Sequence, residues 1–419
     1  MSSEFEKNLE KYAEVLVKVA LNLQPGQKLF VYGPFTIGVP LELAPLVRLV
    51  AEKAYKCGAT HVEVKWYDEN LRLTRFQHAP LDSFTEFPIW IYDYIQQFIK
   101  EGNALLSFIA WNPDLLSEQD PEKIKLFQQT YFKGIEQVSK LMQSYPTNLS
   151  YVAGPVEGWA KKVFPNLPQE SRINKLWDMI FEMCRVKEKD PISAWREHIN
   201  QLKKRQDYLN KKKYQTLQFN APGTNLTIGL PKDHRWVSGN ITTKSGIEHA
   251  VNVPTEEIFT TPHKNKTEGF VKATKPLYFA EGLMEDFKLT FSEGKIIEAT
   301  ARKGEEFLQN LINMDEGAHR LGEVALVPQS SPISKMDMLF YNGLIDENAS
   351  SHIAFGKGLR LGLKDGVKMS DEEFAEAGGN YSKVHVDFMI GSEKMDVDGI
   401  MEDGTVEPIM RNGEWAFEV

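Results

Sequence analysis

The first half of the chain alternates between two patterns of apolar residues. Apolar positions recur every three or four residues, the period of an amphipathic helix, over 5–23, 40–57, 89–101 and 121–143. Short apolar or alternating runs typical of strands lie between them, at 28–33, 61–67, 104–111 and 149–154. Strands that alternate with helices predict a parallel sheet covered on both faces. The fold class expected for this half is α/β with a mostly parallel sheet.

The pattern changes after a long helical segment at 171–213. From residue 214 short strands dominate, separated by hairpin signals such as Pro222-Gly223 and Glu293-Gly294, and one helix is expected at 304–313. This predicts an α+β domain with an antiparallel-rich sheet. Because 419 residues exceed what one hydrophobic core usually serves, we predict two domains. The first is an N-terminal α/β domain of residues 1–213 that ends in a long helix, and the second is an α+β domain of residues 214–419.

The composition excludes several classes of function but says little about the fold. The net charge of −9 disfavours a surface for nucleic acid or anionic membranes. Two cysteines give no disulfide framework and indicate a reducing compartment. The first residues lack the pattern of a secretory signal, and no apolar run reaches the roughly 18 residues of a membrane span. Since no glycine-rich phosphate motif follows a predicted strand, nucleotide binding is disfavoured as well. We expect a cytoplasmic protein without nucleic-acid or membrane partners.

The strongest chemical signal is a histidine two residues before an aspartate. His385 and Asp387 lie on an alternating apolar run, and this spacing on a strand places both side chains on one face. An imidazole and a carboxylate presented side by side are a typical pair of metal ligands.

Further acids lie beside segments that otherwise favour burial. The set consists of Glu256, Glu257, Glu323 and Glu347, the last lying five residues before His352. An acid in such a place costs several kcal/mol unless it is paired or bound to metal. Together with His385 and Asp387 these residues exceed the roughly three protein ligands of one catalytic zinc. They suit two divalent ions about 3.5–4 Å apart, which would lower the pKa of a bridging water, while a spare carboxylate acts as general base.

The segments that hold these residues resemble one family over nearly the whole chain. The similar segments are 159–165, 252–262, 321–328, 346–356, 384–392 and 408–417. They are similar to the thermophilic-type metalloaminopeptidases, peptidase family M29 (the aminopeptidase T, AmpS and PepS group).

The resemblance implies a metallo-hydrolase that removes N-terminal amino acids from short peptides. It implies two divalent metal ions per chain, Zn²⁺ or Co²⁺ with Mg²⁺ or Mn²⁺ as alternatives, and a homodimer whose active sites face an internal cavity. The metal ligands that it implies are Glu323, Glu347, His352, His385 and Asp387, plus one of Glu256 and Glu257. Because neighbouring residues of a strand face opposite ways, only one of the two glutamates is expected to reach the metal. We favour Glu257 as the ligand, and either glutamate as the residue that carries the proton to the leaving amine.

One position departs from the family pattern. The family has a tyrosine seven residues after the first histidine, where this chain has Leu359. A tyrosine there would donate a hydrogen bond to the oxyanion, and losing such a donor costs about 2.7–4 kcal/mol. Arg360 and Tyr381 are the candidates to replace it.

Two other functions remain open at this point. One is a metal-binding pseudoenzyme or weakly active peptide-binding homologue, which the leucine at 359 would favour. The other is an iron site of an oxygenase made of two histidines and one carboxylate, although the additional glutamates argue against it.

Overall fold

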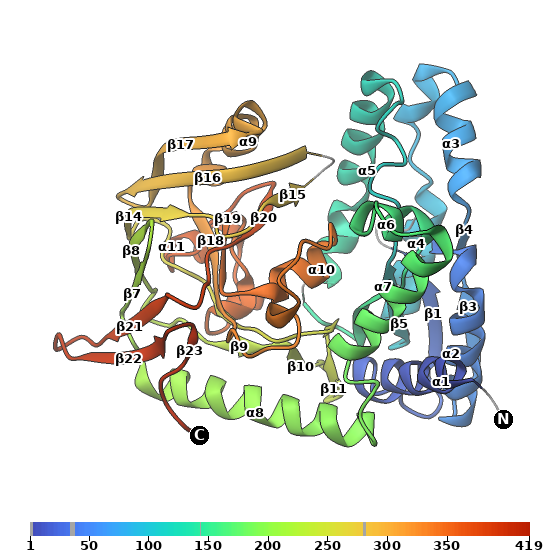
Figure 1. Ribbon diagram of the computed structural model, residues 1–419, viewed down its shortest axis with the longest axis horizontal. Coiled ribbons are helices and arrows are strands. Elements are labelled where there is room, and N and C mark those ends of the chain that lie inside the picture. Colours follow the sequence, from blue (N-terminus) through green and yellow to red (C-terminus); the bar gives the residue numbers. More distant parts are fainter. Residues whose placement is uncertain (1–2, 34–37, 143, 280–281) are drawn as a thin grey trace. The chain divides into compact units, whose positions relative to one another are not determined.

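The computed structural model describes residues 3–33, 38–142, 144–279 and 282–419 (Figure 1). The chain forms two compact units. Unit 1 consists of Met1–Glu197 and Asn240–Pro254, and unit 2 consists of His198–Gly239 and Thr255–Val419. Within the described residues, no helix has both the length and the apolar character that crossing a membrane requires.

Unit 1 contains the parallel sheet expected from the sequence. Its strands, in sheet order, are β12 (Asn252–Val253), β6 (Leu149–Ala153), β5 (Ala104–Ile109), β1 (Lys28–Tyr32) and β3 (His61–Val64). Every neighbouring pair is parallel. The central strand β5 is buried along its whole length, which explains its uninterrupted run of apolar residues.

Helices lie at the ranges predicted over 5–23, 40–57, 89–101 and 121–143, and two further short helices, at 69–78 and 157–163, were not predicted. The helices of unit 1 are α1 (Glu4–Val15), α2 (Ala44–Lys56), α3 (Glu69–His78), α4 (Ile89–Lys100), α5 (Pro121–Met142), α6 (Glu157–Val163) and α7 (Gln169–Met183). The apolar side of α4 packs through Ile91, Ile95 and Phe98 on Phe30 and Leu105 of the sheet. Gln143, the last residue of the predicted helix 121–143, lies outside the described residues.

The predicted helix 171–213 is two helices. The first is α7, and the second is α8 (Pro191–Lys212). Between them Arg185 has a φ of 56°, in the left-handed region that ends a right-handed helix. The apolar period is the same in both helices, so the periodicity alone did not show the break.

Unit 2 is α+β and antiparallel, as expected. Its larger sheet has the order β15 (Leu277–Phe279), β16 (Gly282–Ser292), β14 (Thr267–Lys272), β8 (Thr224–Gly229), β7 (Thr216–Ala221), β21 (Asp396–Ile400), β22 (Val406–Arg411) and β23 (Glu414–Trp415), and β17 (Lys295–Lys303) pairs with β16. The predicted hairpin turns are present, since Gly223 joins β7 to β8 and Gly294 joins β16 to β17, both at positive φ. Helix α9 (Glu305–Ile312) matches the predicted helix at 304–313.

The smaller sheet of unit 2 carries the candidate chemistry. Its order is β20 (His385–Met389), β19 (His352–Gly356), β18 (Leu321–Leu326), β13 (Ile258–Thr260) and β9 (Val237–Ser238), and all neighbouring pairs are antiparallel. One face of this sheet packs into the core of unit 2 through Val324, Ile353, Phe355, Val386 and Phe388. Because strand side chains alternate, the residues between these positions lie on the opposite face.

The boundary between the units differs from the predicted one at 213/214. Unit 2 begins inside α8 at His198, because Leu202 and Leu209 of this helix pack in the core of unit 2. Residues 240–254 return to unit 1, where β12 pairs with β6. A two-residue strand carries too little pattern for sequence periodicity to reveal it.

Candidate metal centre

Three strands place four of the predicted residues on one face of the smaller sheet. Glu323 of β18 pairs with Ala354 of β19, which pairs in turn with Asp387 of β20. His352 lies two residues before Ala354 and therefore faces the same side, and His385 pairs with Gly356. Alanine and glycine in the middle strand leave room for the larger polar side chains on both sides.

A β-bulge turns Glu323 toward this face. The pairing of β18 with β19 shifts between Leu321 and Glu323, with Gly322 as the extra residue. Leu321 consequently pairs with Phe355 and lies in the core, whereas Glu323 pairs with Ala354 on the polar face. In a regular strand two residues at this spacing would face the same way. The bulge therefore allows an apolar anchor and an acid to be two residues apart.

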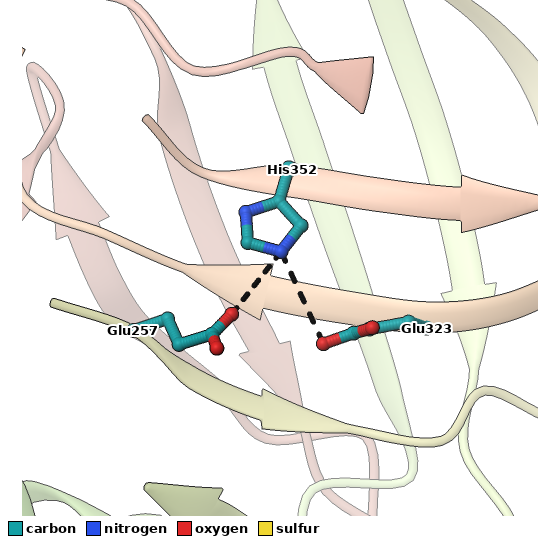
Figure 2. Close-up of side chains that lie close together, drawn as sticks. All are labelled: Glu257, Glu323 and His352. Atoms are coloured by element: carbon teal, nitrogen blue, oxygen red, sulfur yellow. Dashed lines mark ion pairs between the residues drawn. The ribbon is translucent and has the colours of Figure 1, made fainter. Parts of the chain in front are cut away.

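Glu323 lies between the two histidines. Its Oε2 is 3.0 Å from Nε2 of His385, and its Oε1 is 3.9 Å from Nε2 of His352. Nε2 of His352 is also 3.2 Å from Oε2 of Glu257. Figure 2 shows the side chains of Glu257, Glu323 and His352 pointing toward one another. On the other side, Nε2 of His385 is 3.2 Å from Oδ1 of Asp387. One carboxylate thus belongs to two groups of potential ligands.

Backbone carbonyls orient both imidazole rings. Nδ1 of His385 lies 2.7 Å from the carbonyl oxygen of Lys357, and Nδ1 of His352 lies 3.2 Å from that of Ser350. A carbonyl can only accept a hydrogen bond, so each Nδ1 carries a proton and each Nε2 faces the carboxylates. This arrangement is typical of metal-binding histidines, whose second ring nitrogen donates to a backbone carbonyl.

The charges in the centre are strongly coupled. Burial raises the pKa of Glu323 to about 7, and the neighbouring Asp387 and Glu257 carboxylates add to this effect while His385 opposes it. Burial by itself lowers the pKa of His352, but the hydrogen bond to Glu257 and the other carboxylates raise it to about 10. The pKa of His385 is raised well above its usual range, against the effect of burial, mainly by Asp387. Without a metal ion the centre therefore holds protons at neutral pH.

Glu257 and Glu256 lie in different surroundings. Glu257 contacts His352 and forms a group of potential ligands with His352 and Glu323. Oε2 of Glu256 instead lies 3.6 Å from Nε2 of His198, which also contacts the Thr255 carbonyl at 2.8 Å. Both glutamates precede β13 and are buried. The structure thus brings Glu257, and not Glu256, to the face that carries the histidines.

Glu347 lies in a short helical segment just before β19. Its pKa is raised well above the usual range, first by burial and then by the charges of Glu257 and Asp387. Glu347 is therefore close enough to interact electrostatically with the other acids, although it is not in either group of three. Its neighbour Asn348 is fully buried and contacts it, with Nδ2 3.4 Å from Oε1 of Glu347.

The donor set fits divalent cations. Glu257, Glu323 and His352 form one group whose ligand atoms lie within 4.8 Å of one another, and Glu323, His385 and Asp387 form the second. Oδ1 of Asp387 is buried and accepts no hydrogen bond among the described residues, although it faces His385. A buried carboxylate oxygen without a hydrogen bond is costly, and a cation at this place would satisfy it. Mixed imidazole and carboxylate ligands are typical of zinc and related ions.

Sequence reasoning missed two residues next to the centre. His198 comes from α8, 57 residues before the carbonyl that it contacts, and no local pattern marks it. Asn348 follows Glu347 directly, but an asparagine in a polar stretch is typical of a turn and gives no sign of complete burial.

Leu359 and Arg360 lie in the segment after β19. The guanidinium of Arg360 donates to the carbonyls of Gly366, at 3.1 Å, and Met369, at 2.8 Å, and forms an ion pair with Asp371. These contacts hold the following turn together. Arg360 is therefore occupied, which weighs against the expectation that it replaces the missing tyrosine.

Comparisons with known proteins cover nearly the whole chain. A family model described as thermophilic metalloprotease (M29) matches residues 5–415. Aminopeptidase 2 of Geobacillus stearothermophilus is 44% identical over 415 residues, 99% of each chain. The solved structure of wild-type AmpT from Thermus thermophilus matches with a TM-score of 0.92 and 41% identity, over 99% of this chain and 100% of that chain.

A second solved structure bears on the iron hypothesis. The 2,5-dihydroxypyridine dioxygenase from Pseudomonas putida KT2440 matches with a TM-score of 0.51 and 11% identity, over 99% of this chain and 97% of that chain. A likeness at this identity shows a shared fold alone. It lends no support to an oxygenase site in this chain.

Proposed function

The chain belongs to the thermophilic metalloprotease family M29 and is a metal-dependent aminopeptidase, and we propose that it hydrolyses short peptides with water activated by two divalent ions. The observation that carries the proposal is the position of Glu323, which belongs to both groups of potential ligands. Two bound ions would supply Lewis acidity and lower the pKa of a bound water to near neutral.

The proposed ligands divide between the two ions. Glu257 and His352 would hold one ion, His385 and Asp387 would hold the other, and Glu323 would contribute to both because it belongs to both groups. Glu347 adds a further carboxylate near the same charges. Zn²⁺ and Co²⁺ are the proposed ions because imidazole nitrogens favour them over Mg²⁺ and Mn²⁺, which remain the alternatives.

Glu256 is the proposed proton carrier. With Glu257 among the metal ligands, Glu256 is the remaining acid of the pair, and its backbone N–H donates to Oδ1 of Asn348 at 2.7 Å. His198 lies beside its carboxylate. As the acid of the pair that lies outside both groups of potential ligands, Glu256 would take a proton from the attacking water and transfer it to the leaving amine.

The substrates and the assembly are proposed from the family resemblance. We propose short peptides with a free N-terminus as substrates and a homodimer as the functional assembly. Light scattering of the purified protein would measure its mass directly. A mass of one chain under assay conditions would contradict the dimer.

Metal removal and reconstitution test the function. The protein is made metal-free with a chelator, and Zn²⁺ or Co²⁺ is then titrated against hydrolysis of aminoacyl substrates. We expect activity to return as the second equivalent of metal binds. Failure of both ions to restore the release of N-terminal residues would refute the proposed mechanism.

A second candidate is a metal-binding homologue with little or no turnover. The leucine at 359 favours it because leucine has no hydrogen-bond donor, and the guanidinium of Arg360 is already engaged with Gly366, Met369 and Asp371. The two candidates agree on metal binding and differ in kcat. The substitution Leu359→Tyr distinguishes the two candidates by its effect on kcat.

A further inference from the structure

We propose that Asn348 is a positioning residue that fixes the Glu256–Glu257 segment and Glu347 relative to each other. The inference rests on the proposed function, because it assigns Asn348 a role in building the two-metal centre.

Three hydrogen-bonding contacts of one amide support it. Oδ1 of Asn348 accepts the backbone N–H of Glu256 at 2.7 Å, across 92 residues of sequence. Nδ2 donates to the carbonyl of Leu344 at 3.1 Å, and it lies 3.4 Å from Oε1 of Glu347. The amide thus joins the segment before β13 to the segment before β19. Those segments carry Glu257 and Glu347.

Because Asn348 is buried, the loss of its hydrogen bonds would be costly. Asn348 is completely buried, so no water replaces a lost partner at its own position. A buried N–H left without an acceptor costs about 1–3 kcal/mol, and the Glu256 segment would shift to find another. Asparagine is suited to this place because it combines an acceptor with two donors on a short, uncharged side chain.

The position of Glu257 depends on this link. Its backbone follows Glu256 directly, and its carboxylate must reach Nε2 of His352, 3.2 Å away. Groups outside the ligand set that orient metal ligands typically contribute 10–100-fold to metal affinity. Asn348 contacts both acid-bearing segments and belongs to neither group of potential ligands. We therefore expect its loss to loosen the centre without removing a ligand.

Two substitutions test the role. Asn348→Leu keeps the branched shape and the number of heavy atoms and removes every polar contact, and Asn348→Ala removes the side chain beyond Cβ. The matched control is Asn148→Leu in unit 1, because Asn148 is also completely buried and its amide also bonds to a backbone carbonyl and a second side chain. Affinity for Zn²⁺ and for Co²⁺ is measured by calorimetry at a temperature where circular dichroism shows each protein to be folded.

We expect both Asn348 variants to bind at least one ion ten or more times more weakly, with a fall in kcat larger than any change in KM. Asn148→Leu should lose thermal stability and keep the affinity of the wild type. A change in affinity of less than tenfold in a folded Asn348 variant overturns the inference, as does an equal change in the control. If the wild type itself binds fewer than two ions, the proposed two-metal function fails. The ratio of metal affinities between the wild type and the Asn348 variants still tests the positioning role.

Discussion

Oε2 of Glu323 lies 3.0 Å from Nε2 of His385, although β19 runs between the strands that carry them. The contact is possible because Ala354 and Gly356 are the residues that β19 places between them. Since the other oxygen of Glu323 faces His352, this carboxylate is common to both proposed ions.

Glu323→Gln should therefore weaken both metal sites at once. Asp387→Asn, which alters only the group with His385, should weaken one site and leave the other near wild-type affinity. Metal content after gel filtration, measured by mass spectrometry, distinguishes the two variants. The exposed Glu402→Gln serves as control. Retention of two tightly bound ions by Glu323→Gln would show that the carboxylate is not shared.

Metal binding should release protons. In the metal-free protein the pKa of His352 is raised to about 10 and that of His385 is raised as well, so both imidazoles are charged at pH 7.5. Because a bound imidazole nitrogen must be deprotonated, the two histidines should release two protons per chain on saturation, and Glu323 and Glu347, whose pKa values are also raised, should add to this number. Metal affinity should rise with pH over the range below the pKa of His352.

Calorimetry in buffers of different ionisation enthalpy counts these protons. The slope of the observed heat against that enthalpy gives the number released. A slope of zero at pH 7.5 would mean that the histidines are already neutral or do not bind metal. The variant His352→Ala should release about one proton fewer than the wild type if both imidazoles are ligands.

Gly322→Ala should distort the His385 side of the centre. A Cβ at this bulge would lie 2.2 Å from the Lys357 carbonyl oxygen, the acceptor for Nδ1 of His385. Displacing that carbonyl should cost about tenfold or more in affinity for one ion. Gly343→Ala is the control, because a Cβ there meets nothing within 4 Å. Equal metal affinity in both variants would show that the bulge at Gly322 does not position the metal ligands.

Leu359→Tyr should reveal whether the missing tyrosine limits turnover. If the chain is an impaired peptidase, we expect kcat to rise tenfold or more, equivalent to about 1.4 kcal/mol of transition-state stabilisation. Metal affinity should stay unchanged, because Leu359 belongs to neither group of potential ligands. Leu359→Phe is the matched control, since it adds the ring without the hydroxyl. Undetectable turnover in all three proteins would favour the binding homologue.

Arg360→Ala should affect stability more than catalysis. The guanidinium holds the carbonyls of Gly366 and Met369 as well as Asp371, and its loss should cost about 1–3 kcal/mol of unfolding free energy. The melting temperature and kcat, measured on the same preparation, distinguish a role in stability from a role in catalysis. A hundredfold fall in kcat with an unchanged melting temperature would instead identify Arg360 as a donor to the substrate.

Local pattern predicted the part of the centre that lies on strands. The alternation around His385 and Asp387 placed both on one face of β20, and the apolar run after Glu323 predicted β18. These predictions succeed because a period of two is a property of the strand itself. The bulge at Gly322 was not predicted, although the glycine stands beside the acid.

The remaining features depend on contacts between distant segments. The local sequence does not show which of Glu256 and Glu257 faces the metal centre. The structure distinguishes them, because Glu256 lies beside His198 and Glu257 lies beside His352. Asn348 joins residues 92 apart, and its burial follows from packing that no local window contains. The same limit explains the boundary between the units, which depends on the pairing of β12 with β6.

The return of residues 240–254 to unit 1 has a consequence for how the protein is made. Synthesis proceeds from the N-terminus, so β12 leaves the ribosome only after residues 198–239, which belong to unit 2. Until then β6 has an unpaired edge in the nascent sheet, the kind of edge that recruits other chains. A recombinant fragment cut at residue 213 would keep that edge permanently. We therefore expect unit 1 expressed alone to aggregate less when residues 240–254 are grafted onto it.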